Sequence, residues 1–303
     1  MLSDTILRNT ILFVGMLFFV ILLLTINLDF KKRKEGKIKG IGEYWLRYIT
    51  FIFITPSFLI PAYLGRPYFN FLVVVMSALY IREFFSMTQV WQERVYRWEG
   101  RIFTLLVLLG TLFKDKFLFF RIPILVFICV LATPVFLRKI EGAVRQTAIT
   151  IIGILYFGWM FSYAIFLRDS FGFGGIIFVC VLVTIDDLAC FWVGKSFGKH
   201  KLIPEISPGK TVEGALGGVI ITVLFASVMK YALPEFSYMK CVFLGLVISF
   251  TGQIGDLVLS VIKRDMGMKD AGKFLPGHGG MLDRFTSWIF TLPVIYYLLY
   301  WIK

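Results

Sequence analysis

Long apolar runs follow one another along the whole chain, with shorter polar stretches between them. A helix needs roughly 20 apolar residues to cross a hydrocarbon core about 30 Å thick. Runs that approach this length begin near Thr10, Tyr48, Tyr68, Ile102, Phe117, Thr147, Gly174, Val212, Met239 and Trp288. Polar and apolar residues do not alternate within them, as they would in a transmembrane strand. The pattern therefore predicts an all-α integral membrane protein, a polytopic bundle of about nine or ten transmembrane helices with polar loops at the cytoplasmic face.

Composition supports this fold class. Hydrophobic residues make up 58% and aromatic residues 17% of the 303 positions, which excludes an ordinary soluble domain of this length. The first apolar stretch, Ile11 to Leu28, is longer than the apolar region of a typical signal peptide. It therefore predicts a membrane span rather than a cleaved leader.

The basic residues are distributed unevenly between the two sets of predicted loops. The formal net charge is +13, and 23 of the 32 Lys and Arg fall in loops that follow odd-numbered spans. These loops are Lys31–Arg47, Arg82–Arg101, Arg138–Arg145, Lys195–Lys210 and Lys263–Arg284. The positive-inside rule places them in the cytoplasm and both termini outside. The charge thus indicates membrane topology rather than binding to nucleic acid.

A change in loop chemistry divides the chain near residue 170. Every predicted cytoplasmic loop after Gly174 is rich in Gly, Lys, Asp and Ser, whereas earlier loops carry little recognisable chemistry. We expect a transmembrane scaffold over residues 1–170 and a transmembrane catalytic region over residues 171–303. The four cysteines lie inside apolar runs, where small buried side chains are the expected role. Two histidines are too few for a His-rich metal centre.

An aspartate pair interrupts the apolar run that begins near Gly174. Asp186 and Asp187 lie late in that run, and ionisable residues within a membrane span usually mark a functional site. The pair is expected to bind a metal or a nucleotide. The alternative is a structural pair that caps a helix or forms a salt bridge near the interface.

A second block, Gly194 to Gly218, combines glycines with four lysines. Glycines allow backbone N–H groups to approach an anion, and the helix N-terminus expected at Lys210 and Thr211 favours phosphate. Ser207 to Gly209 reads as a turn. A Walker A loop is excluded, because Pro204 and Ala189 occupy the positions where its first glycine would be required. A plain solvated basic loop is the alternative.

The third block, Gly255 to Asp283, is the most charged part of the C-terminal region. Asp256, Ser260 and Lys263 share one helix face by their spacing. Asp283 follows a glycine-rich turn and is expected to begin the last helix. Two carboxylates on neighbouring helix ends, with lysines between them, suit Mg²⁺ and a polyphosphate. The alternative is a loop of mutually paired surface charges.

At these residues the chain resembles the CDP-diglyceride synthetases, the phosphatidate cytidylyltransferase family. The family signature S-x-x-K-R-x4-K-D-x-x-x-x-x-P-x-H-G-G-x-x-D-R is matched by Ser260, Lys263, Arg264, Lys269, Asp270, Pro276, His278, Gly279, Gly280, Asp283 and Arg284. A second family block is matched from Phe197 to Gly214. The resemblance covers roughly Tyr156 to Ser287, and Glu83 at a helix end is a further point of similarity.

The resemblance implies transfer of a cytidylyl group from CTP to phosphatidic acid in phospholipid biosynthesis. The implied cofactor is Mg²⁺, with a second cation as an option, and the implied metal ligands are Asp256, Asp283 and Asp187. The expected catalytic residues are Asp256, Asp283, Lys263, Arg264 and His278. The expected substrate-binding residues are Ser207, Lys210, Thr211, Ser260, Lys269, Gly279, Gly280 and Arg284. The expected partners are CTP, phosphatidic acid and membrane lipids, with a second copy of the chain as a candidate.

One departure from the family pattern bears on activity. The family continues D-R-x-D-S, but this chain has Thr286 in place of the second aspartate. A weakly active or catalytically silent paralogue is therefore an alternative. Another is a different CTP-dependent membrane transferase or kinase with an isoprenoid-alcohol or ether-lipid acceptor. A transporter is disfavoured, because the ionisable residues gather at one face of one half of the chain.

Overall fold

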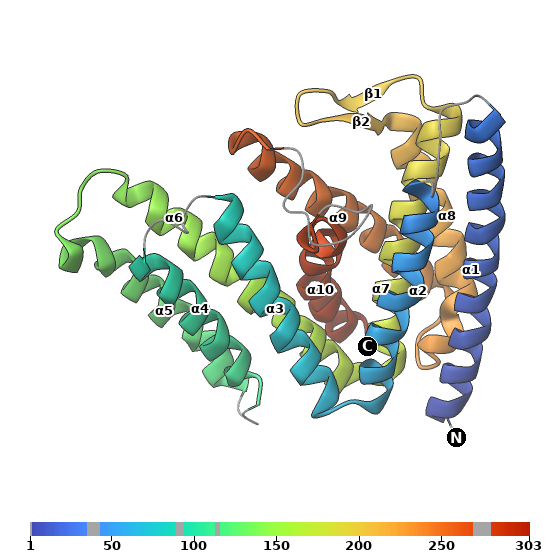
Figure 1. Ribbon diagram of the computed structural model, residues 1–303. Helices are drawn as coiled ribbons and strands as arrows, with labels where there is room; N and C mark the ends of the chain where they lie inside the picture. Colours follow the sequence, from blue (N-terminus) through green and yellow to red (C-terminus); the bar gives the residue numbers. More distant parts are fainter. Residues whose placement is uncertain (1, 35–42, 89–93, 113–115, 269–279) are drawn as a thin grey trace.

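The computed structural model describes residues 2–34, 43–88, 94–112, 116–268 and 280–303, and the architecture within these residues is a polytopic helical bundle (Figure 1). The N-terminal helices are α1 (Leu2–Lys34), α2 (Glu43–Leu64), α3 (Tyr68–Met87), α4 (Arg94–Gly110), α5 (Lys116–Leu137) and α6 (Ala143–Gly153). A π-helical turn, η2 (Ile154–Met160), joins α6 to α7 (Phe161–Phe197). The C-terminal helices are α8 (Val212–Val228), the short 3₁₀ helix η3 (Met229–Ala232), α9 (Tyr238–Asp265) and α10 (Leu282–Ile302).

Seven helical stretches in the described part of the chain are long and apolar enough to cross a membrane. They are Ser3–Asn27, Tyr68–Met87, Phe119–Leu137, Ala143–Phe197, Val212–Ala232, Tyr238–Asp265 and Phe285–Ile302. The apolar part of α2, Tyr48–Leu64, is shorter. These stretches confirm a multi-pass membrane bundle, while the finer count of nine or ten spans stays a prediction.

The stretch Ala143–Phe197 contains a break at Gly172. At 55 residues it is long enough for two crossings, and Gly172 adopts φ 69° and ψ −168° inside it. This backbone conformation is essentially restricted to glycine. The break falls close to the predicted division at residue 170, although the division into scaffold and catalytic region stays a prediction.

Helix α7 is the centre of the C-terminal half, where it packs against α8, α9 and α10. Small residues allow the close approach of α7 and α8. A Cβ atom built at Gly218 of α8 would lie 2.3 Å from the Cys190 sulfur and 2.9 Å from an Asp186 oxygen of α7. Close packing through small residues is the usual way in which membrane helices associate. It brings α8 into direct contact with Asp186.

A short hairpin is the one part of the described architecture that the all-α prediction lacks. Strands β1 (Lys201–Ile203) and β2 (Ser207–Thr211) pair antiparallel and project beyond the end of α7 (Figure 1). The predicted turn at Ser207 to Gly209 is therefore wrong, because these residues begin β2. The expected helix start after Thr211 is confirmed, since α8 begins at Val212.

The cysteine prediction is also corrected in part. Cys180 and Cys241 are buried as expected, but Cys129 is exposed on α5 and Cys190 is half-buried. In a membrane helix an apolar side chain can face lipid instead of protein, so burial within the bundle does not follow from an apolar sequence context.

Candidate active site

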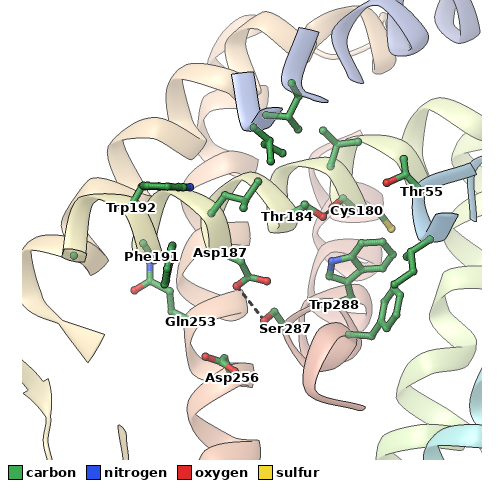
Figure 2. A pocket seen from close by; sticks show the side chains of 18 of the residues that line it. Thr55, Cys180, Thr184, Asp187, Phe191, Trp192, Gln253, Asp256, Ser287 and Trp288 are labelled. Atoms are coloured by element: carbon green, nitrogen blue, oxygen red, sulfur yellow. Dashed lines mark hydrogen bonds between the residues drawn. The ribbon is translucent and has the colours of Figure 1, made fainter. Parts of the chain in front are cut away.

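A cavity of about 690 Å³ opens within the C-terminal half and extends to the first two helices. Its charged lining comes from α7, β2 and α9 and includes Asp187, Lys210 and Asp256, with Ser287 of α10 beside them. Apolar side chains of α1 and α2 line another part of it. Figure 2 shows Asp187, Ser287 and Asp256 in the same region of this cavity, carried by three different helices. A single space thus joins charged groups to an apolar wall.

Two close contacts fix the charged part of the cavity. The ammonium Nζ of Lys210 lies 2.7 Å from Oδ2 of Asp256. The hydroxyl of Ser287 donates a hydrogen bond of 3.3 Å to Oδ1 of Asp187 (Figure 2). The Lys210 and Asp256 side chains are 26% and 36% exposed, so this ion pair is accessible to a ligand. Such a pair can exchange its internal partner for a phosphate or a cation.

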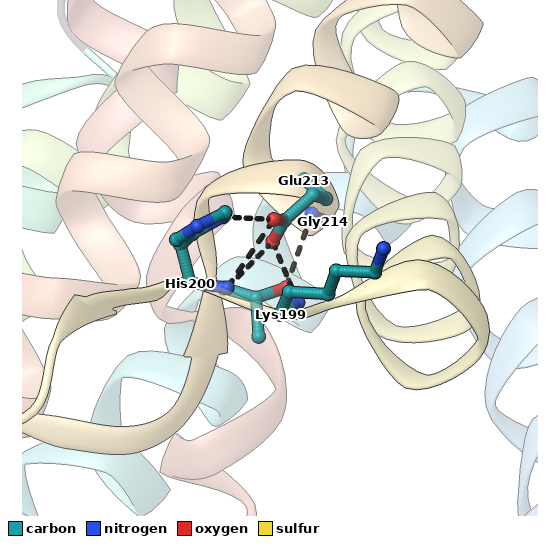
Figure 3. Close-up of polar contacts among 5 residues, drawn as sticks. Lys199, His200, Glu213 and Gly214 are labelled. Atoms are coloured by element: carbon teal, nitrogen blue, oxygen red, sulfur yellow. Dashed lines mark hydrogen bonds and ion pairs between the residues drawn. The ribbon is translucent and has the colours of Figure 1, made fainter.

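The hairpin that carries Lys210 is anchored to the start of α8 by Glu213. The Glu213 carboxylate accepts hydrogen bonds from the backbone N–H groups of Lys199 (3.1 Å) and His200 (3.2 Å), and it lies 2.6 Å from Nδ1 of His200 (Figure 3). The Thr211 hydroxyl caps the same helix by accepting from the Gly214 N–H at 3.1 Å. A negative side chain in the first turn of a helix is favoured by the helix dipole. These contacts fix the position of β2 relative to the cavity.

Asp186 has a different role from its neighbour. It is fully buried, and its carboxylate accepts hydrogen bonds from Thr222 of α8 (3.2 Å) and from Ser249 and Gln253 of α9. Gln253 also donates to the carbonyl of Ala215 at 3.2 Å. The aspartate pair therefore divides into a structural residue, Asp186, which links α7 to α8 and α9, and Asp187, which lines the cavity.

The predicted site residues fall into three groups. Asp187, Ser207, Lys210, Thr211 and Asp256 line the cavity together.

Ser260, Lys263 and Arg264 lie on α9 outside the cavity lining. The Ser260 hydroxyl donates to the Asp256 carbonyl at 2.8 Å. The Arg264 guanidinium donates to the Ile206 carbonyl of the hairpin at 3.2 Å, so it supports the hairpin. Their roles toward substrate stay predictions.

The third group lies outside the described residues. It comprises Lys269, His278 and Gly279, together with the side chains of Asp283 and Arg284. Gly280 is buried next to the start of α10.

The carboxylates suit Mg²⁺ by their chemistry. Within the described residues no three His, Cys, Asp or Glu side chains gather closely enough to hold a metal by themselves. Asp187 and Asp256 supply two carboxylates to one cavity, and Mg²⁺ prefers one or two carboxylates together with phosphate oxygens and water. The donor set fits an ion that is held jointly with a polyphosphate.

Sequence reasoning missed three contributors to the site. Gln253 and Ser287 line the cavity beside Asp256 and Asp187, and Gln253 could have been found from its position three residues before Asp256 on the same helix face. Tyr156 of η2 donates to the Thr286 carbonyl at 3.3 Å. No feature of the sequence indicates this last contact.

Glu83 connects the N-terminal helices to the site. Its Oε2 atom, on α3, accepts a hydrogen bond of 2.8 Å from the backbone N–H of Leu282, the first residue of α10. A carboxylate at this place satisfies a helix N–H that has no partner within the helix and complements the helix dipole. The signature residues Asp283 and Arg284 follow Leu282 directly. Glu83 therefore helps to position the start of α10, the helix that carries them.

Comparisons with known proteins identify the family of the chain. Residues 45–302 match the cytidylyltransferase family, so the chain belongs to that family. It is 34% identical over 263 residues to a phosphatidate cytidylyltransferase of Bacillus subtilis, with 84% of this chain and 96% of the relative covered. A phosphatidate cytidylyltransferase of Staphylococcus aureus (strain COL) is 40% identical over 167 residues, which cover 54% of this chain and 63% of the relative. An uncharacterized protein of Escherichia coli, YnbB, is 32% identical over 280 residues, with 88% and 89% covered.

We predict that Asp186 can be replaced by asparagine but not by alanine. Asp186→Asn keeps an oxygen acceptor for Ser249 and Thr222, whereas Asp186→Ala leaves buried donors unpaired at a cost of about 1–3 kcal/mol for each group. Thermal unfolding of the purified protein in detergent should show a clear loss of stability for alanine and a small one for asparagine. An Asp186→Asn protein that is stable but loses cytidylyl transfer completely would contradict the structural role.

We predict that Glu83 acts through the position of α10. Glu83→Ala should destabilise the protein by about 0.5–2 kcal/mol, as loss of a helix cap does, and should lower the turnover number more than it raises the KM for CTP. Glu83→Gln, which keeps an acceptor oxygen, should recover most of both. Glu141→Ala, at an exposed position before α6, is the control. An unchanged turnover number in Glu83→Ala would contradict the prediction.

Proposed function

We propose that this protein transfers a cytidylyl group from CTP to phosphatidic acid, giving CDP-diacylglycerol and pyrophosphate. The observation that carries the proposal is the single cavity in which Asp187, Lys210 and Asp256 are continuous with an apolar wall. A water-soluble nucleotide needs the charged part, and a lipid acceptor needs the apolar part. Membership of the cytidylyltransferase family supports the reaction type.

The proposed reaction is a displacement at phosphorus. An oxygen of the lipid phosphate forms a bond to the α-phosphorus of CTP, and the bond from that phosphorus to the bridging oxygen breaks as pyrophosphate leaves. A phosphate monoester is already a nucleophile near neutral pH, so no strong general base is needed. The main obstacle is repulsion between two anions, and positioning with cationic contacts lowers it.

On this proposal, Lys210 exchanges Asp256 for a phosphate oxygen when the substrates bind. Ser207 and Thr211 lie on the same strand and border the same cavity, where they limit the positions that a phosphate can take. Lys263, Arg264, Lys269 and Arg284 are proposed as further phosphate contacts, and His278 is proposed to orient a phosphate rather than to act as a base.

Asp187, Asp256 and Asp283 are proposed to hold Mg²⁺, which would supply neutralising charge to the phosphates. The same residues would hold a second cation if the reaction uses one. Ser287 keeps the Asp187 carboxylate in a fixed orientation through its hydrogen bond.

The proposed location is a bacterial inner membrane, with the active site at the cytoplasmic face. The multiple long apolar helices support a multi-pass protein, and the basic loops support the orientation. A homodimer stays an expectation.

Other acceptors are the second candidate function. The similarity to the uncharacterized YnbB of Escherichia coli means that similarity alone does not select phosphatidic acid over an ether lipid or an isoprenoid alcohol.

The proposal predicts that purified protein with labelled CTP, Mg²⁺ and phosphatidic acid will form a CDP-lipid. Asp187→Asn and Asp256→Asn should each lower the rate about 100-fold or more, because they remove charge from the groups proposed to hold Mg²⁺ beside the reacting phosphates. Asp265→Asn, an exposed position on the same helix as Asp256, should retain the wild-type rate. Chromatography of the labelled product gives the measurement. Full turnover in both cavity variants would overturn the assignment.

A separate prediction concerns Thr286. This residue is buried and does not line the cavity, and a Cβ atom at Gly255 of α9 would lie 3.1 Å from its carbonyl oxygen. We expect Thr286→Asp to leave the rate unchanged or lower it, because the new carboxylate would be buried at a position that does not line the cavity. A gain of about 100-fold in the same assay would favour the weakly active paralogue instead.

A further inference from the structure

Helix α1 lies outside the part of the chain that matches the family, yet it forms part of the cavity wall. The family match begins at residue 45, and α1 spans Leu2–Lys34. Its cavity-lining residues are Val14, Leu17, Phe18, Ile21 and Thr25. This spacing of three or four residues places them on one face of the helix.

The opposite face of α1 points away from the bundle. Leu12, Met16 and Phe19 are 67%, 57% and 59% exposed, as expected of side chains that face lipid. In Figure 1, α1 lies at one edge of the molecule, beside α2 and α8 and far from α4 and α5. The helix therefore has one face toward the cavity and the opposite face exposed on the outside of the bundle.

Specific contacts hold α1 in this place. The hydroxyl of Tyr63, at the end of α2, donates to the Asp4 carboxylate at 2.9 Å. The rings of Phe13 and Phe225 of α8 meet edge to face with centroids 5.6 Å apart, and those of Phe18 and Tyr48 of α2 with centroids 6.1 Å apart. Helix α1 is thus tied to both neighbours that border the cavity, and its inward face has a defined position.

We propose that α1 is the specificity-determining wall of the acceptor site, and that the apolar tail of the lipid acceptor lies against Leu17, Phe18 and Ile21. This inference rests on the proposed function. The charged groups of the cavity come from α7, β2 and α9, and α1 contributes only apolar side chains and Thr25 to the lining. A lipid whose phosphate is held at Lys210 must leave its tail in the apolar part, where α1 sets the available width.

The proposal separates two properties of the enzyme. The family-matched segment supplies the chemistry, and α1 selects the tail. A pocket of apolar side chains discriminates by size, and a change of one methylene group alters selectivity about 10- to 200-fold. Substitutions on the inward face of α1 should therefore change the preferred acceptor and leave the handling of CTP unchanged.

A matched pair of tryptophan substitutions tests this wall. Ile21→Trp adds a large ring on the cavity side, and Phe19→Trp enlarges the ring on the lipid side of the same helix. Native mass spectrometry of detergent-released protein titrated with dioleoyl phosphatidic acid measures lipid binding without turnover. We expect about tenfold weaker binding for Ile21→Trp and no change for Phe19→Trp. The KM for CTP should be the same in all three proteins.

Leu17→Ala provides an independent variant that opens space instead of filling it. The affinity of this variant for a branched-chain phosphatidic acid, divided by its affinity for the dioleoyl lipid, should be about tenfold higher than in the wild-type protein. If Ile21→Trp does not fold, this ratio decides, and an unchanged ratio overturns the proposal. Equal lipid binding by wild type, Ile21→Trp and Phe19→Trp also overturns it, as does the absence of lipid binding by wild type. If the lipid binds in the expected pattern but no CDP-lipid forms, the proposed reaction is overturned, while the proposed role of α1 in binding the lipid stands.

Discussion

An aspartate side chain inside an apolar helix is tolerated only where neighbouring groups donate hydrogen bonds to it, and this constraint organises the C-terminal half. Thr222 of α8 and Ser249 and Gln253 of α9 meet the requirement for Asp186. Consecutive residues of an α-helix point about 100° apart, because 3.6 residues make one turn. With Asp186 fixed in the interface of α7, α8 and α9, Asp187 is turned toward the cavity. A structural aspartate thus sets the orientation of the one that is available for chemistry.

The balance of charge in the cavity follows from the same constraint. Asp187 and Asp256 are like charges in one space, and the Lys210 contact with Asp256 offsets one of them. Lys210 can do so only because Glu213 and Arg264 attach the hairpin to α8 and α9 at its two ends. The hairpin, which carries Lys210, is therefore anchored to both helices. On the proposed function, polyanionic substrates enter a site in which Lys210 is already paired with Asp256, so that this lysine exchanges one anionic partner for another.

The sequence was sufficient for the parts of the structure that depend on local pattern. Apolar runs predicted the membrane helices. The motifs and the helix-face spacing led us to expect Asp187, Lys210 and Asp256 at one site, and all three line the same cavity, while their roles stay predictions. The hairpin was missed because Pro208 and Gly209 favour turns when considered locally, while the pairing of Lys201 with Thr211 depends on the partner strand. The sequence also could not distinguish the roles of Asp186 and Asp187, because the hydrogen-bond donors that hold Asp186 lie 36 to 67 residues further along the chain. The contributions of His278, Lys269 and the Asp283 carboxylate stay predictions.

If α1 selects the acceptor as proposed, a sequence signature does not by itself define the substrate of such a protein. The family-like motifs lie between residues 156 and 287 in the sequence, but the cavity that they border is completed by Leu17, Phe18 and Ile21. A phosphate is recognised by charge, which constrains the residue types at Lys210 and Asp256. A lipid tail is recognised by shape, which many combinations of apolar side chains can provide. On the proposed role of α1, its inward face would vary without a cost to the chemistry, and chains with the same motifs would differ in the acceptor that they prefer.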